Sequence, residues 1–167
     1  TTDKATQMFF AETQNKLLYA VTQKTAAEII VSRADANSPN MALTNWKGTK
    51  VRKQDIYIAK NYLTKDEIDT LNRLVVIFLE TAELRIKERI DISMEFWTKN
   101  VDRLLEFNNK PLLASKGSIS NKEMEDKVSE MYHLFEDRRK KQEAIADDKM
   151  ELNELNELEK KLKRREK

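Results

Sequence analysis

Few side chains in this sequence could perform catalysis. It contains one histidine, His133, and no cysteine, which excludes disulfides, thiolate metal sites and cysteine nucleophiles. Glu80 and Glu83 lie one helical turn apart, as carboxylates do in the metal sites of helix bundles. Those sites need two Glu-x-x-His pairs, which one histidine cannot supply. His133 has no partner motif and is interpreted as a partly exposed helix residue. We therefore expect no enzyme activity, no catalytic residue, no cofactor and no metal.

Residues 46–53 are the strongest candidate for a binding segment. Four cations and a tryptophan fall within eight residues, and Gly48 permits close approach of a ligand. Cations contact phosphates, and a tryptophan can stack on a base or fill a pocket of a protein partner. In the structural alternative the tryptophan fills the core and the cations are merely solvated, and we predict that it is at least half buried while the cations face water. The candidate nucleic-acid or partner patch is Trp46, Lys47, Lys50, Arg52 and Lys53.

The sequence changes character after Phe135. Ile145 is the one aliphatic side chain of any size between residues 137 and 149, so we expect docking on the core to end at Phe135. The basic cluster at residues 138–141 is expected to be a solvated helix face. Leucines then return at helical spacing and form a candidate partner helix: Leu152, Leu155, Leu158 and Leu162. Because Asp148 and Glu159 fall where a coiled-coil dimer needs apolar residues, pairing of two copies is expected to be weak.

Helices must position all of these side chains, because residues that break helices are almost absent. The 167 residues include two glycines and two prolines, too few for a turn-rich β fold or a glycine-dependent nucleotide-binding fold. The pattern predicts an all-α helical bundle of about six helices with a long projecting C-terminal helix. The expected helices cover about residues 4–21, 26–35, 53–62, 65–89, 94–108 and 121 onward. We divide the chain into a bundle at residues 1–136 and a charged helical extension at 137–167.

Helix starts are marked by residues that cap free backbone amides. Three capping boxes and one further N-cap are expected, at Thr25 with Glu28, Thr64 with Glu67, Ser120 with Glu123, and Ser93. The helix that follows Thr64 is apolar on two sides, which is typical of a central helix. We therefore predict that the segment from Ile68 to Ile86 is the most buried and that Phe78 lies in the core.

Charge and hydropathy narrow the range of partners. The formal net charge is +2, so bulk charge predicts neither nucleic acid nor membrane as a partner, and only a local patch could attract one. No apolar run approaches the roughly 20 residues that span a bilayer, and no signal peptide is recognisable. We expect a cytoplasmic protein. Because the sequence begins with Thr1 rather than methionine, we also expect it to be the C-terminal piece of a longer protein.

Several motifs, in order along residues 8–135, resemble the C-terminal half of RhuM-like virulence proteins. The matching runs lie at residues 14–22, 24–30, 33–35, 43–48, 58–63, 71–74 and 82–84. The resemblance implies a helical module that accompanies a winged-helix-like, DNA-binding N-terminal module, and it carries over no catalytic residue. The polar or aromatic side chains on the matching motifs are candidates for a shared site or a buried polar network: Trp46, Asn61, Tyr62, Asn72, Arg73 and Glu83. Independently of the resemblance, Glu83 is expected to cap or pair within the bundle, with Arg73 or Arg85 as its candidate partner.

Together, the residues and the resemblance favour a non-enzymatic interaction or oligomerisation module from a bacterial virulence-associated protein. Its expected partner is another protein or a second copy, held weakly through the C-terminal helix, with DNA contacted by the missing N-terminal module and no membrane involved. The main alternative is that this domain binds nucleic acid itself through residues 46–53. An enzyme or toxin activity is the least favoured hypothesis.

Overall fold

The computed structural model describes residues 2–90 and 93–166, with side chains from Lys4 onward, and over these residues the fold is all-helical. Five α-helices are present among them: α1 (Thr2–Thr22), α2 (Ala26–Arg33), α3 (Lys65–Lys87), α4 (Met94–Phe107) and α5 (Asn121–Arg165). Three short 3-10 helices lie between α2 and α3: η1 (Pro39–Ala42), η2 (Lys53–Tyr57) and η3 (Ala59–Tyr62). The expected number of about six helices therefore exceeds the number of α-helices in the described residues by one.

The helix starts agree closely with the caps expected from the sequence. The side chains of Thr25 and Thr64 accept the amides of Glu28 and Glu67, and both glutamates return a hydrogen bond to the capping residue. Ser93 and Ser120 also cap their helices, each accepting an amide three residues later. The third expected capping box is only half formed, because the carboxylate of Glu123 pairs with Lys127 and returns no hydrogen bond to Ser120 among the described residues. These local hydrogen bonds satisfy amides that have no partner within the helix, so they fix where α2, α3, α4 and α5 begin.

The segment at residues 53–62 is not the single α-helix that was expected. Asp55 is buried, and its carboxylate accepts the backbone amide of Arg52 at 2.8 Å. The side-chain amide of Asn61 donates to the backbone carbonyl of Asp55 at 2.9 Å, so this carbonyl has a partner outside the helical pattern. Ile58 between the two pieces has an extended backbone. Side chains thus compete with helical hydrogen bonding, which leaves two short 3-10 helices.

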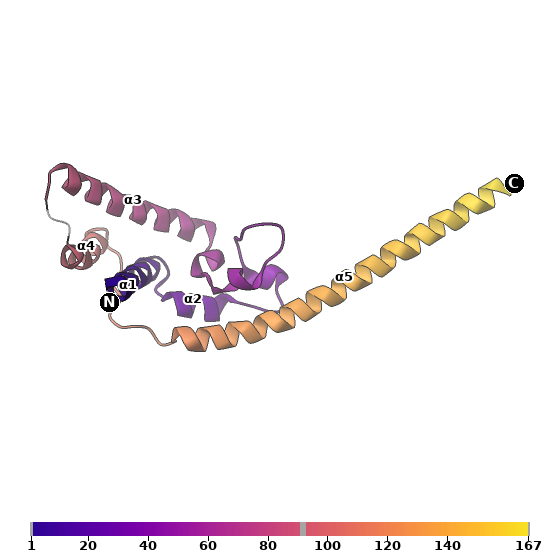
Figure 1. The fold of residues 1–167 in the computed structure, drawn as a ribbon, viewed down its shortest axis with the longest axis horizontal. Helices are drawn as coiled ribbons and strands as arrows, with labels where there is room; N and C mark the ends of the chain where they lie inside the picture. The colour runs from indigo at the N-terminus through magenta and orange to yellow at the C-terminus, as the bar shows by residue number, and fades with distance from the viewer. Residues whose placement is uncertain (1, 91–92, 167) are drawn as a thin grey trace.

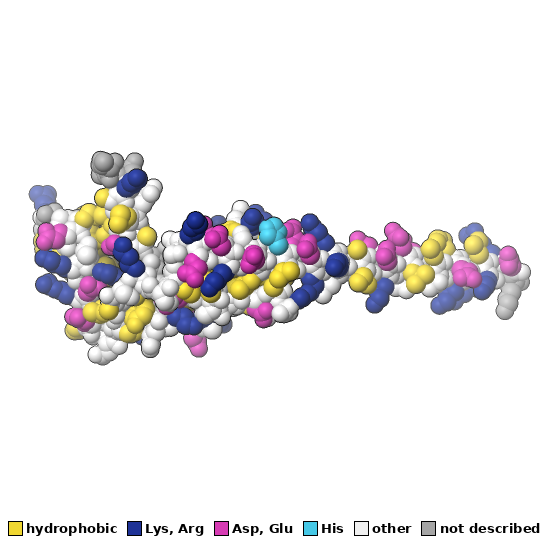
Figure 2. All heavy atoms as spheres, turned by 90° about the horizontal axis from the view of Figure 1, so that it is seen from below, with side chains coloured by type: hydrophobic (Ala, Val, Ile, Leu, Met, Phe, Trp, Pro, Cys, Tyr) yellow, Lys and Arg dark blue, Asp and Glu magenta, His cyan; other side chains and the backbone are white. Residues whose placement is uncertain are grey.

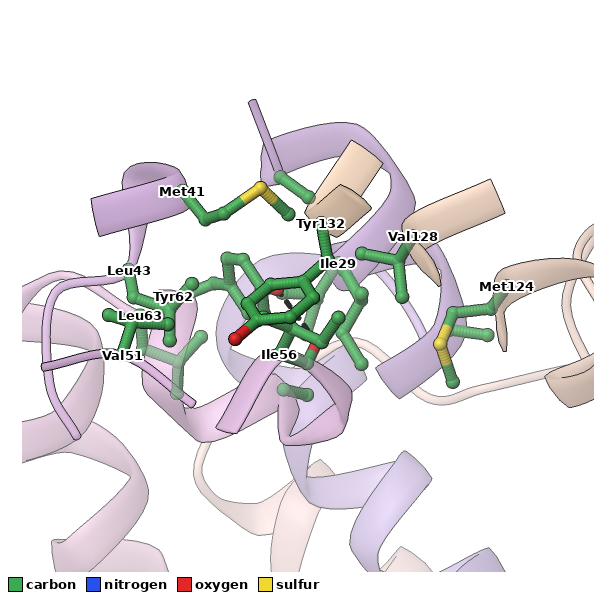
Figure 3. Packing of buried hydrophobic residues seen from close by; sticks show 14 of the residues in the cluster. Ile29, Met41, Leu43, Val51, Ile56, Tyr62, Leu63, Met124, Val128 and Tyr132 are labelled. Carbon is green, nitrogen blue, oxygen red and sulfur yellow. Dashed lines mark hydrogen bonds between the residues drawn. The ribbon is translucent and has the colours of Figure 1, made fainter. Parts of the chain in front are cut away.

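The larger of two apolar clusters joins α2, the 3-10 segment and the first half of α5. Figure 3 shows Ile29 from α2, Ile56 and Tyr62 from the 3-10 segment, and Val128 and Tyr132 from α5 around one another. The Tyr62 hydroxyl donates to the carbonyl of Ile56 at 2.7 Å, and burial raises the pKa of this hydroxyl. Residues about 100 positions apart in the chain therefore share one core.

The smaller apolar cluster lies between α1, α3 and α4. Its buried members are Ala20, Leu74, Phe78, Val101 and Leu105. Leu17 and Val21 of α1 pack against both clusters and so connect them. The ring of Phe78 lies 6.5 Å from that of Trp97, so α3 and α4 approach each other at these two rings. The prediction that Phe78 belongs to the core is confirmed, since it is 9% exposed.

Helix α3 is not the most buried segment that its two apolar sides predicted. Its buried residues, Leu71, Leu74 and Phe78, all lie on the side that faces α1 and α4. Side chains on the opposite side are 54–59% exposed: Val76, Leu79 and Ile86. The physical reason is that the neighbours of α3 occupy one side only among the described residues. By contrast, η2, η3 and α2 carry several fully buried side chains.

Helix α5 extends from the body as a continuous rod of 45 residues (Figure 1). At 1.5 Å per residue its length is about 68 Å. Its last buried residue is Phe135, and every described residue from Lys140 to Glu166 is exposed. The predicted continuous projection beyond Phe135 is confirmed. No helix in the described ranges is long and apolar enough to cross a bilayer.

Candidate interaction surfaces

Trp46, in the basic segment, is mainly a packing residue. Its side chain is largely buried against the larger apolar cluster, which confirms the burial predicted for it. The indole nitrogen is buried and lacks a hydrogen-bond partner among the described residues. A tryptophan in this position packs at the edge of the core, so much of its ring is covered.

The cations of residues 46–53 face water, as predicted, but two of them already have carboxylate neighbours. Lys50 donates to Glu143 of α5 at 2.7 Å, and the guanidinium of Arg52 lies 3.7 Å from the Asp55 carboxylate. Lys47 and Lys53 are exposed and show no ion pair within the described ranges. Two of the four cations therefore remain available to an anionic partner.

The loop that carries these cations is fastened to α5 beyond the last buried residue. Arg139 donates to the backbone carbonyl of Val51 at 2.8 Å, and Arg138 donates to the side chain of Asn37 at 2.6 Å. With the Lys50–Glu143 pair, these contacts bind α5 to two loops over two further turns. Polar docking thus continues past Phe135 to Glu143, and Arg138 and Arg139 are not part of a purely solvated face. The division of the chain at residue 136 stays a prediction.

The polar residues on the family-like motifs do not form one cluster. Asn61 and Tyr62 are buried and satisfied by the backbone of the 3-10 segment. Asn72, Arg73 and Glu83 are exposed on α3, where Arg73 and Glu83 are about 15 Å apart along the axis by helical rise. The structure therefore separates a structural pair from three solvent-facing side chains.

Glu83 does not pair with the arginines expected as its partners. Arg73 binds Asp69, one turn earlier, at 3.0 Å. The Arg85 guanidinium lies 3.7 Å from the centre of the Phe96 ring, a cation–π contact that joins α3 to α4. Both arginines thus have other neighbours, and Glu83 is left at the surface.

An ion pair that sequence reasoning missed connects α2 to α3. Arg33 binds Glu67 through two parallel contacts of 2.6 and 2.8 Å, and it also donates to the carbonyl of Tyr62 at 3.0 Å. The Arg33 hydrogen bonds, with one from Thr64, lower the pKa of Glu67 to about 2. The capping box had assigned Glu67 a local role. No spacing rule links it to a residue 34 positions away.

The candidate partner helix carries its leucines on the surface. Leu152, Leu155, Leu158 and Leu162 are 56–63% exposed. Figure 2 shows apolar side chains along the thin part of the molecule, between acidic and basic ones. Glu143 is the last residue of α5 that makes a hydrogen bond or ion pair with another element among the described residues. We call residues 144–166 the free segment, and the face that bears the four leucines the leucine stripe.

No group of three or more potential metal ligands is found in the described ranges, and His133 is an exposed residue of α5. Three surfaces of exposed side chains could meet a partner: the basic segment at residues 46–53, the side of α3 that bears Val76 and Leu79, and the leucine stripe. A hollow of about 830 Å³ also lies between α1 and the segment at residues 113–123.

A comparison with known protein families matches most of the chain. The family model of the Virulence protein RhuM family matches residues 1–143. The chain thus belongs to the RhuM family of virulence proteins, as its motifs had indicated. The match ends at Glu143, where α5 makes its last contact with another described element. No curated protein and no solved structure matches the chain.

Proposed function

We propose that this chain is a non-enzymatic interaction module whose contact element is the free segment of α5. The observation that supports it is the leucine stripe, four side chains 56–63% exposed on a helix that leaves the body. Apolar side chains at helical spacing are the pattern by which a helix binds another helix or a groove. The stripe begins after the last contact between α5 and the loops, so the body leaves it accessible.

The energetics of the free segment favour this role. Helix propensity and pairs such as Glu159 with Lys163, 3.2 Å apart, stabilise the helix locally. Each such pair contributes about 0.2–0.5 kcal/mol, and none of them requires leucine. Burial of apolar surface contributes about 25 cal/mol per Å², which the leucines gain only when something covers them. A partner therefore explains the leucines, whereas solubility of a lone helix does not.

In this proposal DNA is contacted elsewhere in the longer protein, by the N-terminal module that the family resemblance implies. The body contributes a rigid attachment, because α5 is part of its larger core through Val128, Tyr132 and Phe135. A partner bound to the free segment would thus be held at a fixed direction relative to the body. The near-neutral net charge of +2 agrees with a domain that is not itself a general nucleic-acid binder.

Photo-crosslinking in cells tests the proposal. A benzophenone amino acid at Asn156, beside the leucine stripe, is expected to give a discrete crosslinked protein on illumination. The same probe at Gln14, an exposed residue of α1, provides the matched control. Addition of Leu155→Gln and Leu162→Gln should remove the Asn156 product. Equal crosslinking at the two positions, or a product that survives the leucine substitutions, would overturn the proposal.

The alternative function is nucleic-acid binding through residues 46–53. It is favoured by Lys47 and Lys53, which are both exposed, and by Gly48, a glycine with open space around it. Such binding would weaken steeply as salt is added, with a log–log slope of about 0.9 per phosphate contact. The double variant Lys47→Glu with Lys53→Glu should then lose affinity for duplex DNA. A salt-insensitive signal, or one unchanged in that variant, excludes this alternative.

A further inference from the structure

The free segment of α5 is divided into two blocks of opposite charge. Residues 147–159 contain six acidic side chains and one lysine, a net charge of −5. Residues 160–166 contain five cations and Glu166, a net charge of +4. The acidic block lies nearer the body and the basic block lies at the end of the described helix. The leucine stripe runs through both, from Leu152 to Leu162.

This polarity makes the segment complementary to a reversed copy of itself. In a parallel pair in register, residues of the same number lie side by side, so acidic meets acidic and basic meets basic. Helices in such pairs lie about 8–10 Å apart, a distance comparable to the screening length at physiological salt, so the repulsion is felt. Reversal of one helix brings each basic block to the acidic block of the other copy.

We propose that the partner of the leucine stripe is a second copy of this chain, bound antiparallel with Glu157 at the pivot. The proposal rests on the interaction role proposed above and names its partner. About this pivot, a residue five positions before Glu157 faces the residue five positions after it in the other copy. Leu152 of each chain then meets Leu162 of the other, and Leu155 and Leu158 lie near the axis.

The charged residues along one edge of the leucine stripe agree with this register. Asp147, Glu154, Lys161 and Arg165 follow one another at spacings of seven, seven and four, so they line one edge of the stripe. About the pivot, Glu154 lies within one residue of the level of Lys161 of the other copy. Asp147 lies two residues beyond the level of Arg165, a distance that the long arginine side chain can span. The opposite edge is less favourable, because Lys149 approaches Lys163 there. Asp148 and Glu159 also fall within the seam, so the association is weak and depends on concentration.

The position of the free segment on the molecule permits this arrangement. The overlap covers residues 148–166 of each copy, all of which lie beyond Glu143, the last contact with the loops. Glu166 of each copy therefore lies short of the body of the other copy. From Glu143 to the pivot the helix rises about 21 Å on each side, which keeps the two bodies apart.

Disulfide trapping tests the orientation directly, since the chain has no cysteine of its own. Asp148→Cys and Glu166→Cys are made in separate chains, which places one thiol at each end of the overlap. Mild oxidation of the mixture is expected to give mainly the mixed disulfide between the two variants. A parallel pair would instead link each variant to itself. Predominant self-linkage, or no more mixed linkage than in the same two cysteine variants carrying Leu155→Gln and Leu162→Gln, would overturn the proposal.

Charge reversal tests the register in the intact chain. Lys161→Glu with Arg165→Glu should weaken the self-association measured by sedimentation at least about tenfold, because attractions at exposed pairs become repulsions. Addition of Asp147→Lys and Glu154→Lys to that variant should restore it. Both variants carry the same changes at the helix C-terminus, so helix stability cancels in the comparison. A quadruple variant no stronger than the double variant contradicts the register.

The result of the photo-crosslinking experiment distinguishes failure of this proposal from failure of the interaction role. If the chain stays a monomer at every concentration while the probe at Asn156 captures a different protein, the proposal that the partner is a second copy is wrong and the interaction role stands. If neither a dimer nor any crosslinked protein is found, both are wrong.

Discussion

The body and the free segment of α5 are helical for different reasons. In the body, helices are short or of ordinary length and pack around two apolar clusters, with residues such as Ile29 and Leu105 fully buried. In the free segment one helix continues with every described residue exposed. The first is stabilised by burial and the second by local propensity alone. A change in one region should therefore leave the other unaffected, and the following predictions test that independence.

The largest effect is expected in the smaller core. Phe78→Ala removes a ring packed against α1 and α4 and should lower the free energy of unfolding by about 3–5 kcal/mol. Leu79→Ala, the matched control on the next position of α3, should change it by less than about 0.5 kcal/mol because Leu79 faces water. Urea unfolding followed by near-ultraviolet signals measures both. Equal losses would show that the outer side of α3 is also covered.

The Arg33–Glu67 pair is expected to come next. Glu67→Gln leaves Arg33 without its charged partner and should cost about 1–3 kcal/mol. Asp69→Asn breaks the exposed ion pair with Arg73, which lies one helical turn away, and should cost less than about 0.5 kcal/mol. Thermal unfolding of the two variants at neutral pH measures the difference. Similar small losses in both would contradict a stabilising role for the pair.

The same pair predicts a pH dependence of the stability of the body. The pKa of Glu67 is lowered from 4.5 to about 2 in the folded state. As pH falls below 4.5 the unfolded state takes up a proton that the folded state does not, so stability decreases towards pH 2. This part of the pH dependence should be missing in Glu67→Gln. Parallel pH profiles for the two proteins between these values would disprove the assignment.

A pair of truncations locates the boundary between the regions. Removal of residues 136–167 deletes the contacts of Arg138, Arg139 and Glu143, and should lower the free energy of unfolding by about 1–3 kcal/mol. Removal of residues 145–167 should leave the melting temperature nearly unchanged while self-association is lost. A large loss of stability in the longer of these two truncated chains would show that the free segment folds back on the body.

The smallest effect is expected where the two regions meet. Lys50→Ala removes an exposed ion pair and should lower the stability only slightly, with less effect in high salt. Because the Lys50 ammonium lowers the pKa of Glu143, the variant should also raise that pKa. Amide exchange near Glu143 should become faster, while that near Tyr132 stays the same. Faster exchange at both positions would mean that the body and α5 are coupled more tightly than the contacts indicate.

Local signals in the sequence predicted local structure well. The caps at Thr25, Thr64, Ser93 and Ser120 act within three residues of themselves, so they can be recognised without knowledge of the fold. The continuous extension of α5 follows from composition for the same reason. The burial of Trp46 was also expected, since a large aromatic ring is rarely left in water.

Long-range pairing was beyond the sequence patterns. Two apolar sides on α3 indicated what could be buried, but not that its neighbours in the described ranges occupy one side only. Asp55 and Asn61 interrupt a predicted helix because of a hydrogen bond between them that spacing does not reveal. Arg33 finds Glu67 only after α2 and α3 have been brought together. For the candidate site, the spacing of the leucines in the sequence identified the leucine stripe. The polar contacts between α5 and the two loops, the last of which is made by Glu143, could be recognised only from the structure.

The arrangement of the two cores has a consequence for the order in which the chain can fold during synthesis. Helices α1, α3 and α4 contain all the buried members of the smaller core, so that core can assemble once residue 105 has left the ribosome. The larger core waits for Met124, Val128 and Phe135, although its first members lie on α2. Until then the part of α2 that α5 covers stays exposed, although α1 and the 3-10 segment can already pack on the rest, and chaperones have a defined period in which to bind it.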